Sequence, residues 1–184
     1  MATTDPEISR NLMPGERVQW SGRPGQGILF TPRDTFMIPF SLLWCGFALF
    51  WEFSVSRTGA PSFFMLWGAM FVCVGLYFVF GRFLFDAWIR SRMSYAVTDQ
   101  RILITRPPPF GTFTAVSLQR VPDMRFNDLG GGRGTIRFGE APSMFAGRGF
   151  SSWSPALDPT PQLLAVDNAK SVFDLLQRSS HGKS

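Results

Sequence analysis

The chain has 184 residues, of which 45% are hydrophobic and only 17% charged, a composition that argues against an ordinary soluble domain of this size. The formal net charge is +5, almost all of it arginine gathered beside hydrophobic runs, and the absence of a basic stripe excludes nucleic-acid binding. Composition therefore predicts a membrane protein with room for one small additional domain.

Residues 1–31 form a polar leader that is rich in Pro and Gly and lacks the apolar core of a signal peptide. Val18 and Trp20 alternate with polar neighbours, which fits one short strand or a segment lying on a surface. Thr31 and Asp34 then predict a helix start, with Thr31 as the N-cap and Asp34 as a carboxylate in the first turn.

Residues 32–90 are predicted to form a transmembrane hairpin with spans at about residues 35–54 and 63–83. Each run approaches the roughly 20 apolar residues that a helix needs to cross a hydrocarbon core of about 30 Å. The connector at 56–62 is short, polar and contains Gly and Pro, so the two helices should be neighbours. Arginines flank the outer ends of the hairpin more than its connector, which predicts that both termini are cytoplasmic.

Three charged residues, Arg82, Asp86 and Arg90, recur every four positions just beyond the second run. We expect them to pair with one another and with lipid headgroups as a collar that ends the span. The alternative is a transport site, but we expect no ionisable side chain deeper in either span. Cys45 and Cys73 should pack within the spans without redox or metal chemistry. Close helix approach is expected at the small residues Gly46, Ala48, Gly68, Ala69 and Gly75.

Residues 93–180 change to alternating periodicity and predict an antiparallel sheet domain, followed by a tail at 181–184. A tight turn is expected at Asp99-Gln100, and Gly130-Gly-Gly-Arg-Gly134 should be a hairpin turn, because a phosphate-binding loop would be followed by a helix. Asp167 is expected to cap a C-terminal amphipathic helix. The expected strands are 94–98, 101–105, 112–118, 121–129, 135–139 and 161–166.

A long loop at 140–160 is rich in Gly, Ser and Pro and yet carries Arg148, Phe150 and Trp153. Two interpretations remain open. The aromatic side chains form a flap that enters the membrane interface or grips a partner, or they fold back and cover the sheet.

Four short motifs stand in a fixed order around the hairpin: Pro14-Gly-Glu-Arg-Val-Gln-Trp-Ser-Gly22, Tyr95-Ala-Val-Thr-Asp-Gln-Arg101, Gly134-Thr-Ile-Arg-Phe-Gly139 and Val166-Asp-Asn-Ala-Lys-Ser-Val-Phe173. With this order the chain resembles the bacterial PH-domain-containing membrane proteins over most of its length. The resemblance implies an α+β membrane protein, in which a two-helix transmembrane hairpin precedes a pleckstrin-homology-like (PH-like) antiparallel β barrel or sandwich capped by a C-terminal α-helix. It also implies a multi-pass protein of the bacterial cytoplasmic (inner) membrane.

The residues predict binding and no enzyme activity, since no catalytic, metal or cofactor set is recognisable. The leading hypothesis is a non-enzymatic, membrane-anchored interaction or scaffold module that binds a protein partner or its own copies, with membrane lipids around the hairpin. The alternatives are anionic-lipid or amphiphile binding by the cytoplasmic domain and, less favoured, a subunit of an oligomeric transporter. Candidate contacts for lipid headgroups or a partner are Arg82, Arg90, Arg92, Arg101, Arg106, Arg148, Phe150 and Trp153.

Overall fold

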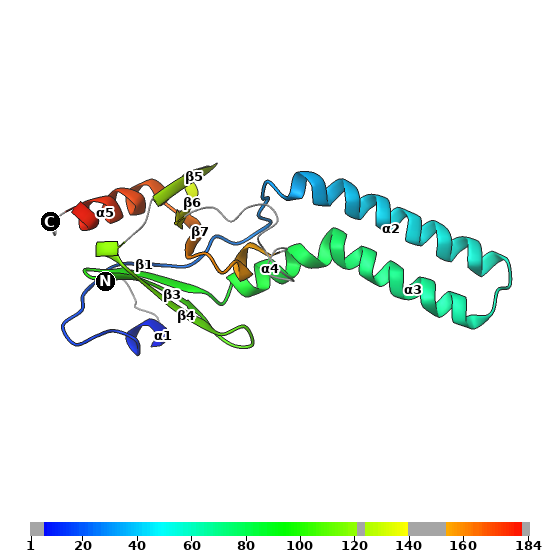
Figure 1. The fold of residues 1–184 in the computed structure, drawn as a ribbon, viewed down its shortest axis with the longest axis horizontal. Helices are drawn as coiled ribbons and strands as arrows, with labels where there is room; N and C mark the ends of the chain where they lie inside the picture. Colours follow the sequence, from blue (N-terminus) through cyan, green and yellow to red (C-terminus); the bar gives the residue numbers. More distant parts are fainter. Residues whose placement is uncertain (1–5, 121–123, 140–153, 182–184) are drawn as a thin grey trace. The chain divides into compact units, whose positions relative to one another are not determined.

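The computed structural model describes residues 6–120, 124–139 and 154–181. The chain divides into two compact units (Figure 1). One unit, here called the hairpin unit, comprises residues 28–85. The other, called the sheet unit, combines residues 1–27 with residues 86–184. The hairpin unit is therefore inserted, in sequence, into the sheet unit.

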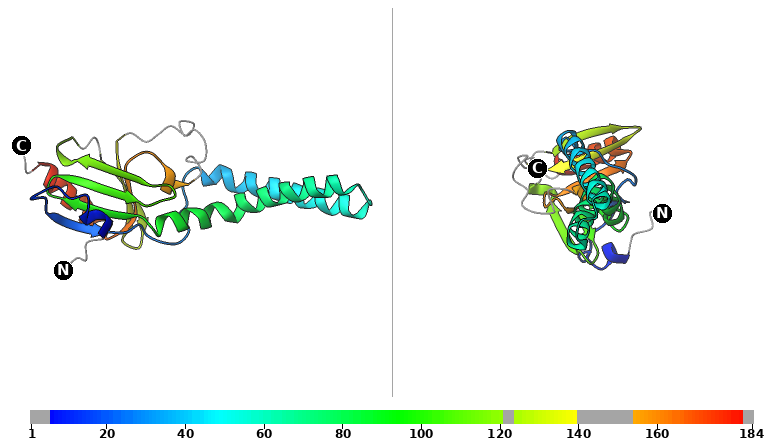
Figure 2. Two further views of the ribbon diagram at one scale, coloured as in Figure 1. Left: turned by 90° about the horizontal axis from the view of Figure 1, so that it is seen from below. Right: turned by 90° about the vertical axis from the view of Figure 1, so that its right-hand side faces the viewer.

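The hairpin unit consists of two antiparallel helices that lie side by side (Figures 1 and 2). The first is α2 (Asp34–Arg57). The second is α3 (Ser62–Leu76), which continues through a π-helical turn at Tyr77–Gly81 into α4 (Arg82–Arg90), and the residues of α4 from Asp86 onward belong to the sheet unit. Both helical stretches, Asp34–Arg57 and Ser62–Arg90, are long and apolar enough to cross a membrane.

The two helices are in close contact at two glycines of α3, Gly68 and Gly75. A Cβ on Gly75 would lie 3.0 Å from Cα of Cys45, and a Cβ on Gly68 would collide with the carboxylate of Glu52. By contrast, Gly46 faces open space. Of the predicted small residues, Gly68 and Gly75 therefore carry the glycine contacts between the helices.

The sheet unit contains a four-stranded antiparallel sheet in the order β1-β2-β3-β4. Its strands are β1 (Val18–Gly22), β2 (Ser94–Thr98), β3 (Arg101–Arg106) and β4 (Thr112–Ser117). β1 precedes the hairpin unit and β2 follows it, yet they are neighbours, with Trp20 opposite Val97. The predicted tight turn at Asp99-Gln100 joins β2 to β3.

A second antiparallel sheet has the order β5-β6-β7. It comprises β5 (Met124–Gly130), β6 (Arg133–Phe138) and β7 (Gln162–Asp167). The predicted glycine turn is confirmed, because Gly130, Gly131 and Gly132 have φ values of 82°, 62° and 77°, which a residue with a Cβ adopts only with strain.

The C-terminal helix α5 (Ala169–His181) follows β7. The expected cap, Asp167, is instead the last residue of β7, where its carboxylate accepts from Nε of Arg133 at 3.1 Å. Asn168 turns the chain with a φ of 52°, and its carbonyl accepts the amide of Val172. The residue at the reversal must adopt the left-handed backbone conformation, which Asn adopts more readily than most other residues. Asp167, by contrast, is still part of the extended strand β7.

The leader contains a short helix, α1 (Pro6–Ser9), that the sequence analysis did not expect. Its Ile8 side chain is buried against Ala96 and Leu103, with Leu12 and Val18 packed beside them. The leader thus belongs to the core of the sheet unit.

The implied closed barrel is not found: the described strands form separate sheets of four and three. The sheets are linked through the buried Tyr95 of β2, whose hydroxyl accepts the amide of Leu164 in β7 at 3.2 Å. Burial raises the pKa of Tyr95. α5 packs on the second sheet, where the rings of Phe126 and Phe173 lie 5.6 Å apart.

Candidate functional site

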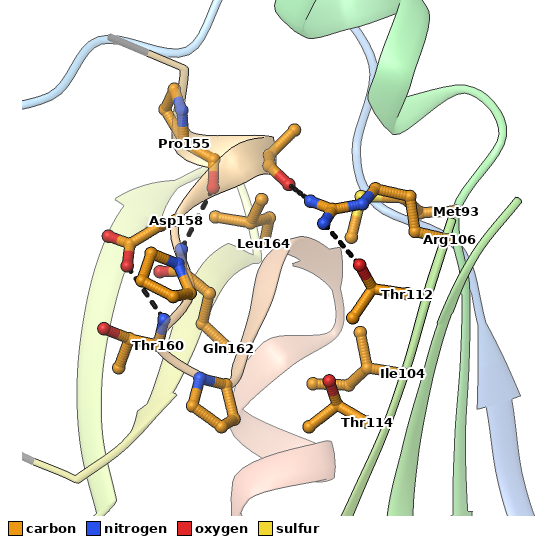
Figure 3. A pocket seen from close by; sticks show the side chains of 13 residues that line it. Met93, Ile104, Arg106, Thr112, Thr114, Pro155, Asp158, Thr160, Gln162 and Leu164 are labelled. Atoms are coloured by element: carbon orange, nitrogen blue, oxygen red, sulfur yellow. Dashed lines mark hydrogen bonds between the residues drawn. The ribbon is translucent and has the colours of Figure 1, made fainter. Parts of the chain in front are cut away.

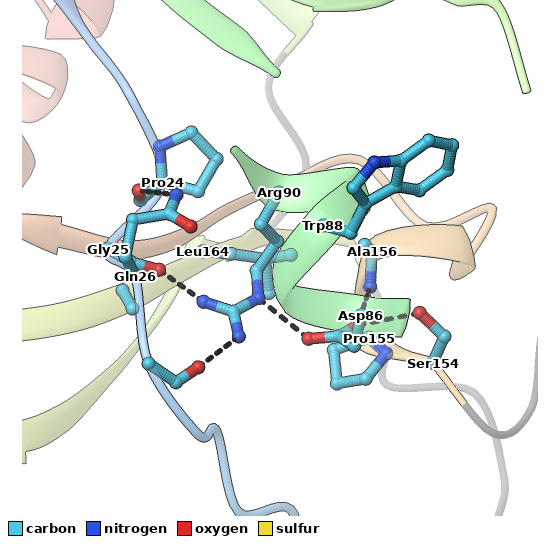
Figure 4. Close-up of polar contacts among 12 residues, drawn as sticks. Pro24, Gly25, Gln26, Asp86, Trp88, Arg90, Ser154, Pro155, Ala156 and Leu164 are labelled. Carbon is cyan, nitrogen blue, oxygen red and sulfur yellow. Dashed lines mark hydrogen bonds and ion pairs between the residues drawn. The ribbon is translucent and has the colours of Figure 1, made fainter. Parts of the chain in front are cut away.

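A buried charged cluster lies at the C-terminal end of α4 (Figure 4). Arg90 is fully buried, and its Nε donates to Asp86 Oδ2 at 2.6 Å, one helical turn away. The other two guanidinium nitrogens donate to the carbonyl oxygens of Gly25 and Gly27. The predicted pairing of Asp86 with Arg90 is therefore confirmed, and every Arg90 nitrogen that can donate has an acceptor.

Asp86 also holds the segment that leads into β7. Its Oδ1 accepts from Ser154 Oγ at 2.6 Å and from the backbone amide of Ala156 at 3.0 Å. The Asp86 carboxylate thus connects α4 to the residues before β7, and its partner Arg90 connects the cluster to the residues before the hairpin unit. Because charged hydrogen bonds shielded from water are strong, this cluster is a fixed support and not a surface contact.

A second buried ion pair lies at the base of the hairpin unit, where α2 begins. Nη1 of Arg82 lies 2.8 Å from Oδ1 of Asp34, and both side chains are buried. Oδ2 of Asp34 accepts from the amide and the hydroxyl of Thr31, at 2.6 and 2.8 Å. The carboxylate folds back on Thr31, but the prediction that Thr31 is the N-cap is wrong. The helix begins at Asp34, and the residue before it, Arg33, makes no side-chain capping hydrogen bond.

The expected pairing of Arg82 with Asp86 is not found. The π-helical turn precedes Arg82, and the Arg82 amide bonds to the Tyr77 carbonyl five residues back. Arg82 and Asp86 both follow this turn in α4, and Arg82 pairs instead with Asp34 at the start of α2. Both Asp86 oxygens are already occupied by Arg90, Ser154 and Ala156.

A third cluster fixes the leader to the turn between β2 and β3. Arg101 donates through Nε and Nη2 to the two Glu16 oxygens, each at 2.9 Å. The Glu16 carboxylate also accepts from the Thr98 hydroxyl at 2.7 Å and from the Met13 amide at 2.8 Å. Nη2 of Arg101 donates in addition to the Asn11 carbonyl at 2.8 Å.

The hydrogen bonds from Arg101 are the main cause that lowers the pKa of Glu16 from 4.5 to about 2. The same pairing raises the pKa of Arg101. The carboxylate is therefore ionised at all physiological pH values. The sequence predicted Arg101 as a headgroup or partner contact, but in the structure its side chain binds residues of the leader.

A small pocket opens between the β3–β4 edge and the residues before β7 (Figure 3). Its volume is about 60 Å³, room for a few water molecules and far below a drug-sized site. Arg106 lies in its wall and donates to the carbonyls of Phe110 and Ala156 and to the Thr112 hydroxyl. Burial lowers the pKa of Arg106. The pocket offers the polar atoms of Asp158 and Thr160 beside the apolar side chain of Leu164.

The other sequence-predicted contacts are placed differently. Arg92 is exposed, with its guanidinium carbon 4.1 Å from the ring centroid of Trp88. Arg148, Phe150 and Trp153 lie outside the described residues, so the two interpretations of their loop remain predictions. Of the described candidates, Arg82 and Arg101 lie in separate clusters. Arg90 and Arg106 are connected through Ala156, whose amide binds Asp86, the partner of Arg90, and whose carbonyl accepts from Arg106.

Sequence reasoning missed Glu52, which lies inside α2 and within the predicted first span. This placement corrects the expectation that neither span holds an ionisable side chain. Its Oε2 atom is buried and has no hydrogen-bond partner among the described residues. The sequence feature that could have identified Glu52 is a single acidic residue between two aromatic residues inside an apolar run.

Across the described ranges, no three His, Cys, Asp or Glu side chains gather as metal ligands would. Cys45 and Cys73 are both free thiols. Comparisons with protein-family models, curated proteins and solved structures found no match to this chain.

Proposed function

We propose that this chain is a non-enzymatic, membrane-anchored interaction module. In this proposal the hairpin unit crosses the cytoplasmic membrane of a bacterium, and the sheet unit, with a PH-like fold, offers a binding surface on the cytoplasmic side. The observation that carries the proposal is the pairing of β1 with β2. Strands that flank the hairpin can pair only if both flanks lie on the same side of the membrane, as an even number of crossings requires.

The surface of the hairpin unit supports membrane insertion. Only 17% of the most apolar window of α2, and 11% of that of the second helical stretch, is buried. A core helix of a soluble protein would bury most of such a window, whereas lipid solvates it. Large apolar side chains that the hairpin unit exposes include Phe36, Leu43, Phe47, Phe50, Phe63 and Leu66.

The order of the sheet unit supports a PH-like fold. Sheets of four and three antiparallel strands are followed by a terminal helix that packs on the second sheet. The open arrangement of the sheets departs from a closed barrel, so the PH-like assignment rests on element order and on the motifs.

Exposed apolar side chains on edge strands favour a protein partner or a second copy. Phe113 on β4 is 43% exposed, and Phe126 and Leu129 on β5 are 37% and 39% exposed. β4 and β5 are each hydrogen-bonded to only one neighbour among the described strands, so each has an unpaired edge there. Such edges are suitable for binding another chain.

Anionic-lipid binding by the sheet unit is the second candidate, and the exposed guanidinium of Arg92 favours it. Arg90, Arg101 and Arg106 favour it less, because their donors already have acceptors within the chain. Sedimentation of the protein with anionic vesicles at low and high salt separates this candidate from protein binding.

Topology is tested with single cysteines in a background that carries Cys45→Ser and Cys73→Ser. A membrane-impermeant maleimide should label Thr58→Cys, in the hairpin connector, in intact spheroplasts, and Lys170→Cys, on α5, only after lysis. Labelling of both positions in intact spheroplasts, or release of the protein from membranes by alkaline carbonate, would contradict the proposal.

Partner binding is tested by photo-crosslinking in intact membranes. A benzophenone amino acid at Phe113 or Leu129 should yield a crosslinked protein or a second copy, and the same group at Lys170 should yield little. If the two edge-strand positions crosslink no more than Lys170, the binding surface lies elsewhere and this part of the proposal fails.

A further inference from the structure

Arg82 differs from Arg90, which is also buried, because two of its side-chain nitrogens have no hydrogen-bond partner among the described residues. Its Nη1 pairs with Asp34, but the buried Nε and Nη2 atoms have no hydrogen-bond partner in the described part of the chain. In a guanidinium group these two nitrogens share one edge, with parallel N–H bonds that match two oxygens of one oxyanion.

Two arginines of the same chain show how such donors are normally satisfied. Arg101 uses its Nε–Nη2 edge to bind both oxygens of Glu16. Arg90 directs its three nitrogens at Asp86, Gly25 and Gly27. A buried, charged donor edge without an acceptor is unfavourable, so the unpaired Nε–Nη2 edge of Arg82 is a candidate site for a ligand that supplies two acceptors.

The surroundings limit how an acceptor reaches this edge. The guanidinium carbon lies 4.4 Å from the ring centroid of Phe83, so one face of the group is covered and the acceptor must approach in its plane. Because the edge is buried, binding requires local side-chain movement. The π-helical turn at Tyr77–Gly81, directly before Arg82, is an irregularity of the kind often found at functional sites.

We propose that the Nε–Nη2 edge of Arg82 binds the phosphate group of a membrane phospholipid, while Asp34 holds Nη1. This inference rests on the membrane insertion proposed above. Arg82 follows the apolar run of the second helical stretch, and Asp34 begins the first, so the pair lies where the spans end and headgroup phosphates are found. Two phosphate oxygens accept the two parallel N–H groups, and Asp34 fixes the plane of the guanidinium.

The test measures how much phospholipid the full-length wild-type and variant proteins retain. Each protein is placed in nanodiscs of phosphatidylcholine and phosphatidylglycerol and is then purified from them in a mild detergent. Native mass spectrometry counts the bound lipid. We expect wild-type protein to retain one phospholipid, and Arg82→Lys and Arg82→Gln to retain it with affinity reduced about tenfold or more. Arg82→Lys keeps a charge for Asp34 but loses the paired donors, so it separates lipid binding from folding.

Arg57→Lys is the matched control, because Arg57 also stacks on a phenylalanine, with its guanidinium carbon 4.2 Å from the Phe53 ring. It should retain lipid as wild type does. Equal retention by wild type and both Arg82 variants would overturn the proposal. Arg82-dependent binding of inorganic phosphate by delipidated protein, without lipid retention, would also overturn it in favour of a free oxyanion. Alkaline carbonate extraction of each variant distinguishes loss of the lipid site from loss of membrane insertion, because carbonate releases only protein that is not inserted.

Discussion

Replacing Glu16 by Gln should release the leader from the sheet unit. The substitution keeps the size of the side chain but removes the charge that holds both Arg101 nitrogens. A pKa lowered from 4.5 to about 2 corresponds to roughly 3 kcal/mol of stabilisation, at 1.36 kcal/mol for each pKa unit. The Glu16 side chain is 0% exposed and that of Arg101 is 14% exposed, so solvent screens this pair less than a surface ion pair, and roughly 3 kcal/mol is an upper bound.

The pH dependence follows from the direction of the shift. Because the folded state lowers the pKa of Glu16, the stabilisation is complete above pH 4.5 and is lost as the pH falls towards about 2. Wild-type protein should therefore lose protection of the leader below pH 4.5. The Glu16→Gln variant should lack this pH-dependent step.

Amide hydrogen exchange of the full chain in detergent measures the effect locally, on peptides that contain α1, β1 and β2. At neutral pH we expect exchange roughly a hundredfold faster in Glu16→Gln, since 1.4 kcal/mol corresponds to a factor of ten. The control is Glu7→Gln, because Glu7 lies 3.6 Å from Arg10 and both side chains are at least half exposed. An exposed pair contributes little, so the control should exchange as wild type does.

Wild-type exchange rates in Glu16→Gln, or equal effects of Glu16→Gln and Glu7→Gln, would show that the Glu16 charge does not hold the leader. A double variant with Arg101→Gln supplies a second check. Because the two side chains bind each other, the effects of the single substitutions should sum to more than that of the double variant.

Three further predictions concern other parts of the chain. Arg90→Met should lower the free energy of unfolding by about 3–5 kcal/mol, because it leaves the buried carboxylate of Asp86 without its counter-charge; urea unfolding in detergent, followed by tryptophan fluorescence, measures the change. Gly75→Leu should disrupt helix contact against Cys45 and lower the thermal midpoint of the protein in detergent, whereas Gly46→Leu, which faces open space, should not. Gly131→Ala should cost about 1 kcal/mol in the same unfolding experiment, because a φ of 62° strains a residue with a Cβ.

Local features of the fold were predictable from the sequence. Alternation and turn residues located every described strand of the region after the hairpin, and the glycines at 130–132 predicted the turn between β5 and β6 because only Gly adopts positive φ freely. Apolar run length predicted the two long helices. These signals depend on periods and propensities within a few residues of one another.

The charged clusters were not predictable in this way. Glu16 and Arg101 are 85 positions apart, and Arg82 pairs with Asp34, which lies 48 positions earlier in the chain. The collar pattern therefore indicated the correct residues but only one correct pair, Asp86 with Arg90. Side-chain partners at long range follow from tertiary packing, which a one-dimensional pattern does not contain.

The interrupted sheet has a consequence for the order of synthesis. β1 leaves the ribosome before the hairpin unit, whereas its only partner among the described strands, β2, is made after it. In the proposed topology β1 cannot pair with β2 until the hairpin unit has entered the membrane and the residues that follow it lie on the cytoplasmic side. A chain that inserted only one helix would leave β1 without a partner and the β1-facing edge of β2 open to proteases or aggregation. In the proposed topology, a completed sheet would therefore mark a chain whose hairpin had inserted correctly.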